Sequence, residues 1–447
     1  MTPIKISFLI FRHTRLNVTN LKLCRAENIC WNMEKKQLEI SNKLFSDSYI
    51  PSFNETYFVA LSGQRENLAM AMFLKAFPSE GGDGDKKYRI GVVQASHPTL
   101  LMKRFLPTNT MHLLHDEILP GLATVLYHKR LREKVADRLV VALDDFGPTA
   151  SDDMMTWLGQ FWRLNNLQAN LRMKNGLKPD EFLDYICFRE AYIGLDSPST
   201  SWYHYGFEEA QGPIEGVDKE LIGNNLRSAA DWIKDEILGK GEKLEAANVL
   251  EMFEDLKKQR RGRKQPIITI ISRTQTRLIL NEKELQQKIQ KSFPMARVQF
   301  IRHETSGIED LIAEVADSIV LIGMHGALMS LATFLPPESI LIEMFPYGIP
   351  AEKYTPYKTL AELPTMKIRY ASWVNPIKDE PFNVGHPERE YTQGGLKNFP
   401  ASYQAGIRDS ETVPEHKCCY SPFWLYKIFQ DSHVQPESII DLIKGLI

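Results

Sequence analysis

The 447-residue sequence lacks any run of 18 apolar residues, the length that a membrane-spanning helix requires. The apolar stretch at residues 6–11 is too short to cross a bilayer, and no small-residue cleavage site follows it. The sequence alone therefore indicates neither a membrane anchor nor a signal peptide.

The chain also lacks an excess of either charge, internal repeats and low-complexity tracts. A net charge of −2 argues against a protein that binds nucleic acid along its length. Five cysteines are too few for a disulfide scaffold. Cys24 and Cys30 are close enough in sequence to form a small loop, Cys187 lies in an apolar run, and buried free thiols are the alternative. The remaining composition is that of a globular protein long enough for two or three domains.

Residues 317–357 predict a strand, a tight turn and a helix, followed by a second strand. The run 318–323 is apolar, as in a strand buried on both faces, and 326–334 has helical spacing that ends before Pro336. The second apolar run starts at Ile340 and ends on Glu343, which favours parallel pairing through a right-handed crossover.

The turn between this strand and helix is a candidate diphosphate site. His325, Gly326 and Ala327 would lie at the carboxyl edge of the sheet, where the free N–H groups of a helix start favour anions. Glu343 could accept the hydroxyls of a ribose. The alternatives are a turn histidine satisfied by a carbonyl group and a solvated carboxylate.

A second apolar run, 266–271, ends in Ser272 and Arg273, with Arg277 four residues further on. Guanidinium groups at the carboxyl end of a strand can form bidentate, charge-assisted bonds with a diphosphate. Surface salt bridging is the alternative for both arginines.

A histidine and an aspartate are expected to meet on one helix face. With Asn109 near the helix cap, His112 and Asp116 are four residues apart, and His115 lies close by. The carboxylate could orient the imidazole, or the charged imidazole could keep the carboxylate ionised. A structural role and metal ligation remain alternatives. The acidic pair Asp144 and Asp145 is interpreted as turn-capping acids rather than as metal ligands.

Residues 199–207 place five aromatic rings in one segment, counting a histidine. An exposed aromatic loop can stack against the apolar face of a sugar, so Trp202 and Tyr205 are candidate acceptor contacts. Core packing is the alternative.

Other expected elements are strands at 89–96, 139–143, 185–194 and 298–301, and helices at 66–76, 154–164, 225–238, 244–258, 308–316 and 437–447. The basic run 257–264 is interpreted as a solvated loop near the start of a second domain.

Several of these segments together resemble glycosyltransferase family 61. The similarity is carried by MHGA with the helix after it, FLPP, ILIE, FPYG, YTPYKTLAELP, SRTQTRLILNE and TSWYHYGF, and it extends through HPEREYTQGG and EHKCCYSPFWLYKIFQD. The family's N-x-x-H-x-x-x-D motif matches Asn109, His112 and Asp116, whereas His115 lies outside it. The resemblance covers most of the chain and is weakest before Pro107.

The resemblance implies an α/β fold of the GT-B type, with two Rossmann-like domains facing across a cleft. We expect an acceptor-side domain at residues 1–240 and a nucleotide-sugar domain at 241–447, whose last segment crosses back. The implied donor contacts are Arg104, Asn109, Ser272, Arg273, Arg277, His325, Gly326, Ala327 and Glu343, with Asp116 and His112 as the catalytic pair.

The implied reaction is the inverting transfer of N-acetylglucosamine from UDP-GlcNAc to the 4-hydroxyl of mannose on Ser or Thr of a glycoprotein of the α-dystroglycan type. No metal and no cofactor beyond the donor are expected, and a homodimer is left open. The endoplasmic-reticulum lumen is the expected compartment, supported weakly by acceptor sequons at Asn17 and Asn54. The anchor and fibronectin-type domain of the resembled proteins are not expected here. One alternative is a transferase of the same family that modifies another acceptor, such as an EGF-like domain, or that transfers xylose. The other alternative is a non-catalytic binding protein with this fold.

Overall fold

The computed structural model of the chain describes residues 7–9, 23–40, 57–60, 69–72, 75–76, 88–93, 98–127, 138–149, 152–196, 199–205, 211–239, 244–304, 306–413 and 421–447. The chain divides into two compact units, Met1–Ser201 and Trp202–Ile447. This division differs from the predicted boundary near residue 240. Helix α6 (Lys219–Leu238) falls in the second unit because its apolar face packs against α9 (Ile308–Ala316) and η5 (Ala327–Phe334).

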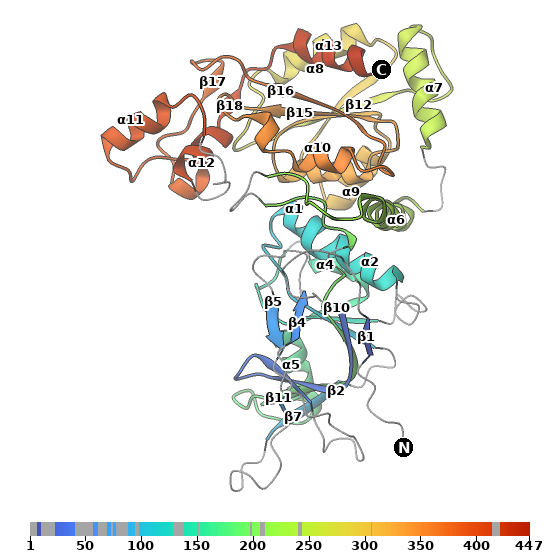
Figure 1. Cartoon of the computed structure of the whole chain (residues 1–447), viewed down its shortest axis with the longest axis vertical. Coiled ribbons are helices and arrows are strands. Elements are labelled where there is room, and N and C mark those ends of the chain that lie inside the picture. Colours follow the sequence, from blue (N-terminus) through green and yellow to red (C-terminus); the bar gives the residue numbers. More distant parts are fainter. Residues whose placement is uncertain are drawn as a thin grey trace. The chain divides into compact units, whose positions relative to one another are not determined.

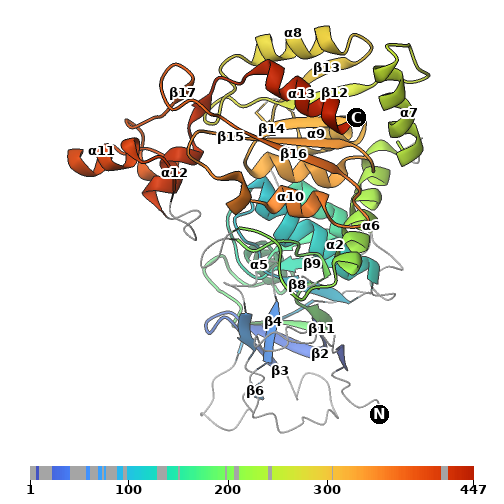
Figure 2. The same cartoon turned by 45° about the horizontal axis from the view of Figure 1, so that its top comes forward.

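The first unit is built on a mixed sheet (Figures 1 and 2). Its order is β10-β9-β8-β11-β2-β3-β6, with β1 beside β2 and β7 beside β11. The segment β10-β9-β8-β11 is parallel, whereas β2 runs antiparallel to β11. The strands are β1 (Ser7–Leu9), β2 (Leu23–Asn32), β3 (Gln37–Ile40), β6 (Lys75–Ala76), β7 (Ile90–Val93), β8 (Thr99–Met102), β9 (Leu139–Ala142), β10 (Gln160–Arg163) and β11 (Tyr185–Ile193). The strands expected near 89–96, 139–143 and 185–194 are thereby confirmed.

Two helices expected in the first unit are wrong. Part of 66–76 instead forms β5 (Ala69–Met72), which pairs with β4 (Tyr57–Ala60), and β6. The region 154–164 holds α4 (Asp152–Met155), a 3-10 turn (Thr156–Leu158) and β10, and the long helix α5 (Leu164–Lys174) begins only afterwards. Tertiary strand pairing overrides the helical spacing in both places.

A disulfide joins Cys30 to Cys187 across 157 residues of sequence. The two cysteines face each other in the antiparallel pair of β2 and β11. The small loop considered between Cys24 and Cys30 is therefore wrong, because the sheet register determines the partner. Cys30 and Cys187 are both fully buried.

The second unit contains a parallel sheet of order β13-β12-β14-β15-β16. The strands are β12 (Ile267–Ile271), β13 (Arg297–Ile301), β14 (Val320–Met324), β15 (Ile340–Phe345) and β16 (Arg369–Val374). Their apolar runs follow from burial on both faces, and every residue of β14 and β15 is buried. The predicted strand pair and its parallel register are confirmed. The strand order reverses direction between β12 and β14.

Helices cover both faces of this sheet (Figure 1). α8 (Glu282–Ser292) and α13 (Pro436–Leu446) pack together, and α13 also contacts β15 and β16. The last helix thus packs on the sheet of the second unit. On the other side lie α9, η5 and α10 (Pro356–Ala361); α6 packs on α9 and η5. The remaining elements are α7 (Ala246–Lys257), η6 (Ala351–Lys353), β17 (Asn383–Val384), η7 (Tyr391–Gln393), α11 (Ala401–Asp409), α12 (Pro422–Ile428) and β18 (Asp431–Ser432).

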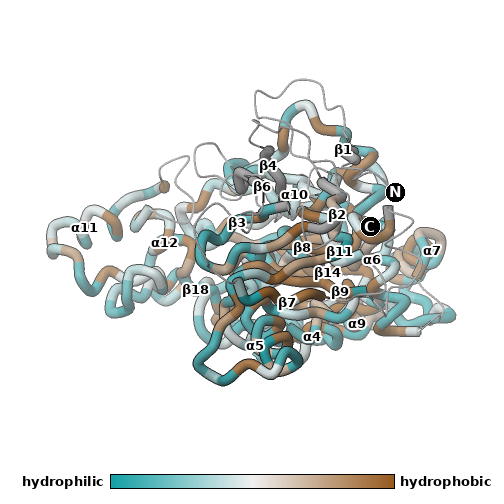
Figure 3. The backbone as a smooth tube through the Cα atoms, turned by 90° about the horizontal axis from the view of Figure 1, so that it is seen from below, coloured by the Kyte–Doolittle hydropathy of each residue, from teal (hydrophilic) through white to brown (hydrophobic). Residues whose placement is uncertain are grey.

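Each unit has its own hydrophobic core. Central strands such as β9 and β14 are hydrophobic along most of their length, whereas the helices alternate between polar and apolar residues (Figure 3). Among the described residues, no helix combines the length and apolar character needed to cross a membrane.

Candidate functional site

The point where the strand order reverses places two sequence motifs side by side. β12 and β14 are neighbours, so Ser272 and Arg273 after β12 and His325 and Gly326 after β14 share the carboxyl edge of the sheet. In doubly wound α/β sheets, ligands bind at the carboxyl ends of the strands on either side of such a reversal. This edge is therefore the candidate anion site of the second unit.

Gly326 allows a guanidinium group to approach the backbone. Its φ of +154° lies in a region that side chains rarely adopt, and a Cβ there would collide with the guanidinium of Arg277. Arg277 donates from Nη1 to the carbonyl oxygen of His325 at 3.0 Å. Ala327 then begins η5, which is a 3-10 helix rather than the expected α-helix. Arg277, His325, Gly326 and Ala327 are thus brought together as predicted.

Glu343 lies inside β15 and contacts His325. The strand continues to Phe345, so Glu343 does not end it as expected. Its side chain is fully buried; Oε1 accepts from His325 Nδ1 at 2.5 Å and Oε2 accepts from the Tyr370 hydroxyl at 2.6 Å. Both oxygens are thus engaged with protein groups, which corrects the expected contact with a ribose. Glu343 instead orients the imidazole and leaves Nε2 as the ring nitrogen that can face a ligand.

Tyr357 belongs to the same group, and Arg273 lies nearby on the loop after β12. The Tyr357 hydroxyl donates to the carbonyl oxygen of Gly326 at 2.7 Å, and its ring packs edge-on against His325. Burial lowers the pKa of Arg273, while the nearby charges of Glu304 and Tyr357 act in the opposite direction. The guanidinium donates from Nε to the carbonyl oxygen of Thr276 at 2.9 Å. Within the part of the chain that the structure describes, Arg273 makes no ion pair, so an incoming anion would stabilise its charge.

Ser272 holds the wall of a neighbouring pocket. Its hydroxyl donates to Glu282 at 2.5 Å and accepts from Arg302 at 3.0 Å. The pocket has a volume of about 660 Å³, and Ser272, Arg273 and Arg302 are among its lining residues. Ser272 therefore bonds Glu282 and Arg302 and helps to line the pocket beside the candidate site.

In the first unit, two histidines converge on one carboxylate. Asn109 caps the helix start by accepting from the Met111 amide, and the chain then forms a π-helix, Leu113–Ile118, between α1 (Thr110–His112) and α2 (Leu119–Tyr127). His112 Nδ1 lies 2.7 Å from Asp116 Oδ2, and His115 Nδ1 lies 2.6 Å from Asp116 Oδ1. The predicted pairing of His112 with Asp116 is present, with His115 as an additional partner. π-Helical turns occur frequently at functional sites.

The pair differs in exposure. The side chain of Asp116 is fully buried, whereas that of His112 is 15% exposed. Burial would raise the pKa of Asp116, but the charge of His115 and the hydrogen bonds from both imidazoles outweigh burial, so its pKa lies below the usual range. Asp116 is thus an ionised carboxylate that orients His112, and His112 is the member of the pair that reaches the surface.

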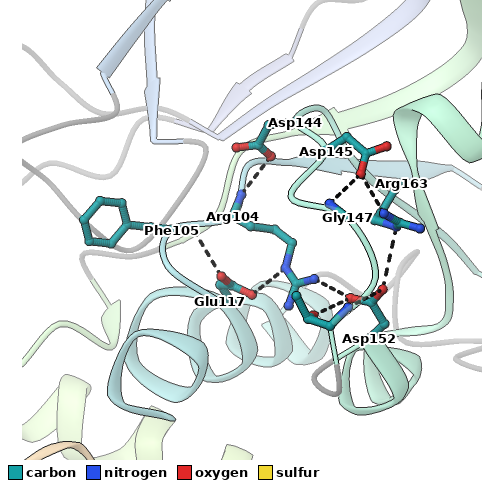
Figure 4. A network of polar contacts seen from close by, with 9 residues as sticks. Arg104, Phe105, Glu117, Asp144, Asp145, Gly147, Asp152 and Arg163 are labelled. Atoms are coloured by element: carbon teal, nitrogen blue, oxygen red, sulfur yellow. Dashed lines mark hydrogen bonds and ion pairs between the residues drawn. The ribbon is translucent and has the colours of Figure 1, made fainter. Parts of the chain in front are cut away.

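Arg104 lies in a separate, buried ionic network (Figure 4). Its guanidinium donates to Glu117 at 2.9 Å and to Asp152 at 2.6 Å, and its side chain is 1% exposed. Its amide donates to Asp144, while Asp145 accepts from the Gly147 amide and from Arg163. Arg104 therefore bonds two acidic side chains within its own unit. Asp145 thus caps its own turn, as interpreted from the sequence, whereas Asp144 bonds the backbone after β8 and caps no helix.

The network also reaches His112. Glu117 accepts from the amide of Phe105 at 3.0 Å, and the ring of Phe105 packs edge-on against His112 with centroids 4.8 Å apart. The buried ions therefore hold the segment that supports the histidine.

Trp202 and Tyr205 are buried, with 1% and 7% of their surfaces exposed. Trp202 donates from Nε1 to the carbonyl oxygen of Pro356, and Tyr203 stacks between the two rings. The core alternative holds for both residues, which corrects the expected exposed stacking platform. Gly206 and Phe207 of this segment lie outside the described residues.

Three contributors were missed or underweighted in the sequence: His115, Tyr357 and Tyr370. His115 precedes Asp116 directly, which was a usable signal. Tyr357 lies within the YTPYKTLAELP motif, which carries no signal for a role of its own. Tyr370 lies on β16 and meets Glu343 because β15 and β16 are neighbours, so no local pattern could identify it.

The sequence was compared with protein families and with known proteins. The family model described as Glycosyltransferase 61 matches residues 111–342. Among the relatives of this chain are several proteins with the name Protein O-linked-mannose beta-1,4-N-acetylglucosaminyltransferase 2, of which three are described here. The chain is 34% identical to that of Bos taurus over 348 residues, which is 78% of this chain and 54% of the relative. It is 33% identical to that of Danio rerio over 346 residues, with 77% and 54% covered. It is 30% identical to that of Xenopus tropicalis over 428 residues, with 95% and 67% covered. The chain thus spans about half the length of most of these relatives.

Proposed function

The chain belongs to the glycosyltransferase 61 family, and from this premise we propose that it transfers N-acetylglucosamine from UDP-GlcNAc to O-linked mannose on a glycoprotein. The acceptor atom is the 4-hydroxyl of mannose on Ser or Thr, and the transfer inverts the anomeric centre. The names of the relatives support the sugar and the linkage. The observation that carries the proposal is the cluster of Arg273, Arg277, His325 and Gly326 at the strand-order reversal.

This cluster has the chemistry that a leaving diphosphate requires. Negative charge develops on the diphosphate as the glycosidic bond breaks, and fixed donors and cations stabilise it. Arg273 and Arg277 supply guanidinium groups, and the buried carboxylate of Glu343 holds the His325 ring in place through Nδ1 at the same sheet edge. In this proposal Arg104 is omitted from the donor contacts because its guanidinium group already bonds Glu117 and Asp152.

The acceptor hydroxyl needs a base, and His112 is our candidate. Asp116 accepts from Nδ1, which leaves Nε2 of the neutral ring to take the hydroxyl proton. The mannose oxygen then forms its bond to the anomeric carbon as the bond to the diphosphate oxygen breaks, and the proton stays on His112. Asp116 stabilises the resulting imidazolium.

The remaining features belong to the same proposal. A GT-B arrangement would let the two α/β units serve acceptor and donor, and the charges of the second unit would act in place of a metal. The buried Cys30–Cys187 disulfide supports a lumenal compartment such as the endoplasmic reticulum, because disulfides persist in oxidising environments.

An assay with purified chain, UDP-GlcNAc and a synthetic O-mannosyl peptide tests the proposal. We expect release of UDP together with a product in which N-acetylglucosamine is β-linked to the 4-hydroxyl of mannose. UDP release without transfer to this peptide would reject the acceptor assignment and retain the donor. Absence of UDP-GlcNAc binding in calorimetry would reject the donor site itself.

A further inference from the structure

Two C-terminal stretches, 386–395 and 429–433, converge on the loop that carries both candidate arginines. We call residues 272–279 the arginine loop. The first stretch has the sequence HPEREYTQGG and begins at His386. None of its residues takes part in the proposed reaction. The contacts of this stretch with the arginine loop give it a role.

Asp431 connects the two stretches to the arginine loop. Its Oδ1 accepts from the Leu278 amide at 2.8 Å, and its Oδ2 accepts from His386 Nε2 at 2.8 Å. The carboxylate is 2% exposed, so both hydrogen bonds are shielded from water. Backbone bonds from Ser432 N to Leu278 O and from Leu280 N to Ser432 O, each 2.9 Å, hold the same segment.

The conformation of Arg277 explains why this segment needs support. Its φ is +57°, a left-handed value that is unfavourable for a residue with a side chain. Such a conformation persists where surrounding contacts enforce it. Asp431 fixes the next amide, and the ring of Phe429 lies 4.9 Å from the guanidinium carbon of Arg277. Together these contacts direct Nη1 to the carbonyl oxygen of His325.

Further contacts hold the arginine loop and the ring of Phe429. Arg389 donates from Nη1 to the carbonyl oxygen of Gln275 at 3.0 Å, at the tip of the arginine loop. Gly394, with φ of +75°, packs directly against Phe429, and a Cβ there would collide with the ring. The HPEREYTQGG stretch therefore supports both the loop and the aromatic ring beneath Arg277.

We propose that His386 and Asp431 are positioning residues for donor binding, and that they act by holding Arg277 in its left-handed conformation against His325. This inference rests on the proposed function, which assigns Arg277 to the diphosphate. Neither residue needs to touch the donor. When His386 is lost, an oxygen of the buried Asp431 carboxylate loses its partner, and the arginine loop can relax.

UDP affinity of purified full-length variants, measured by calorimetry, tests this inference. We expect His386→Ala to weaken UDP binding about tenfold, because a charged hydrogen bond is lost. His386→Gln keeps an N–H donor for Asp431 and should restore most of the affinity. The donor KM should rise with the dissociation constant, while kcat at saturating donor changes less. Lys397→Ala removes an exposed ion pair with Glu390 in the same stretch and should leave UDP affinity unchanged.

A double-mutant cycle separates positioning from a general loss of stability. If His386 acts through Arg277, adding His386→Ala to Arg277→Ala should weaken UDP binding by less than about twofold further. Additive losses, or wild-type affinity in His386→Ala, would overturn the inference. Should His386→Ala fail to fold, Asp431→Asn, which retains an acceptor for the Leu278 amide, carries the same cycle. If Arg277→Ala itself binds UDP normally, the proposed anion site fails instead.

Discussion

Each unit places an arginine two residues beyond a parallel strand, and the two arginines have different partners. Arg104 follows β8 and Arg273 follows β12. Arg104 is bound by the carboxylates of Glu117 and Asp152, whereas Arg273 donates to the neutral carbonyl of Thr276. The same local pattern therefore gives a neutralised ion in one unit and a cation available to a ligand in the other.

The difference lies in what surrounds each charge. A buried guanidinium between carboxylates contributes to the fold and has little capacity left for a substrate anion. A half-buried guanidinium on a carbonyl keeps its charge, and burial makes that charge costly until an anion arrives. An arginine after a strand is thus a candidate for anion binding, but the group that it bonds determines whether it stabilises the fold or binds a ligand.

The largest expected effect separates chemistry in the first unit from binding in the second. Asp116→Asn should lower turnover by about 10²- to 10⁴-fold, because His112 loses the carboxylate that orients it and stabilises its charged form. UDP affinity should stay unchanged. Initial rates with the O-mannosyl peptide and calorimetry with UDP measure the two quantities. His303→Ala, at an exposed histidine of the second unit, is the control. A parallel loss of UDP affinity would contradict this division of roles.

The next effect concerns stability. Arg104→Met should lower the free energy of unfolding by about 3–5 kcal/mol, because two carboxylates lose their buried partner. Denaturant unfolding measures the change, and the folded fraction should bind UDP normally. Arg89→Met removes an exposed pair with Glu181 and should change stability by less than about 1 kcal/mol. If Arg104→Met instead keeps its stability and loses UDP binding, the comparison between the arginines is reversed.

Substitution of Arg273 should have the opposite effect to substitution of Arg104, because it should weaken UDP binding and leave stability nearly unchanged. Arg273→Ala, and likewise His325→Ala, should weaken UDP binding about 10- to 100-fold, because each removes a side chain that the proposal assigns to the diphosphate site. The midpoint of thermal unfolding should move little for Arg273→Ala. Lys288→Ala, at an exposed lysine paired with Glu437, is the matched control. Unchanged affinity in both site variants would remove the assignment of this sheet edge to the donor.

The remaining prediction concerns the pH dependence of the first-unit network. Burial raises the pKa of Glu117 to about 8, against the opposing charge and hydrogen bonds of Arg104. Between pH 4.5 and about 8 the unfolded carboxyl has released a proton that the folded one retains. The free energy of unfolding should therefore fall as the pH rises through this window. Glu117→Gln cannot titrate and should flatten this slope, and an identical slope in both proteins would assign it to other groups.

The second unit could be predicted well because its signals are local. The apolar runs that became β12, β14 and β15 are each ended by a polar residue or proline, and Gly326 marks the turn where Arg277 approaches. The pairing of His112 with Asp116 follows from a four-residue spacing, and it survives even though the local helix is a π-helix.

What the sequence by itself determined is the strands of the second unit and the polar residues near their ends, because both follow from periodicity and turn chemistry over a few residues. Only the tertiary structure decided the partners. Arg104 meets Asp152 after 48 residues, Trp202 meets Pro356 after 154, and Cys30 meets Cys187 after 157. Such contacts depend on strand order and packing, and it is the charge and burial of the partner that give each residue its role.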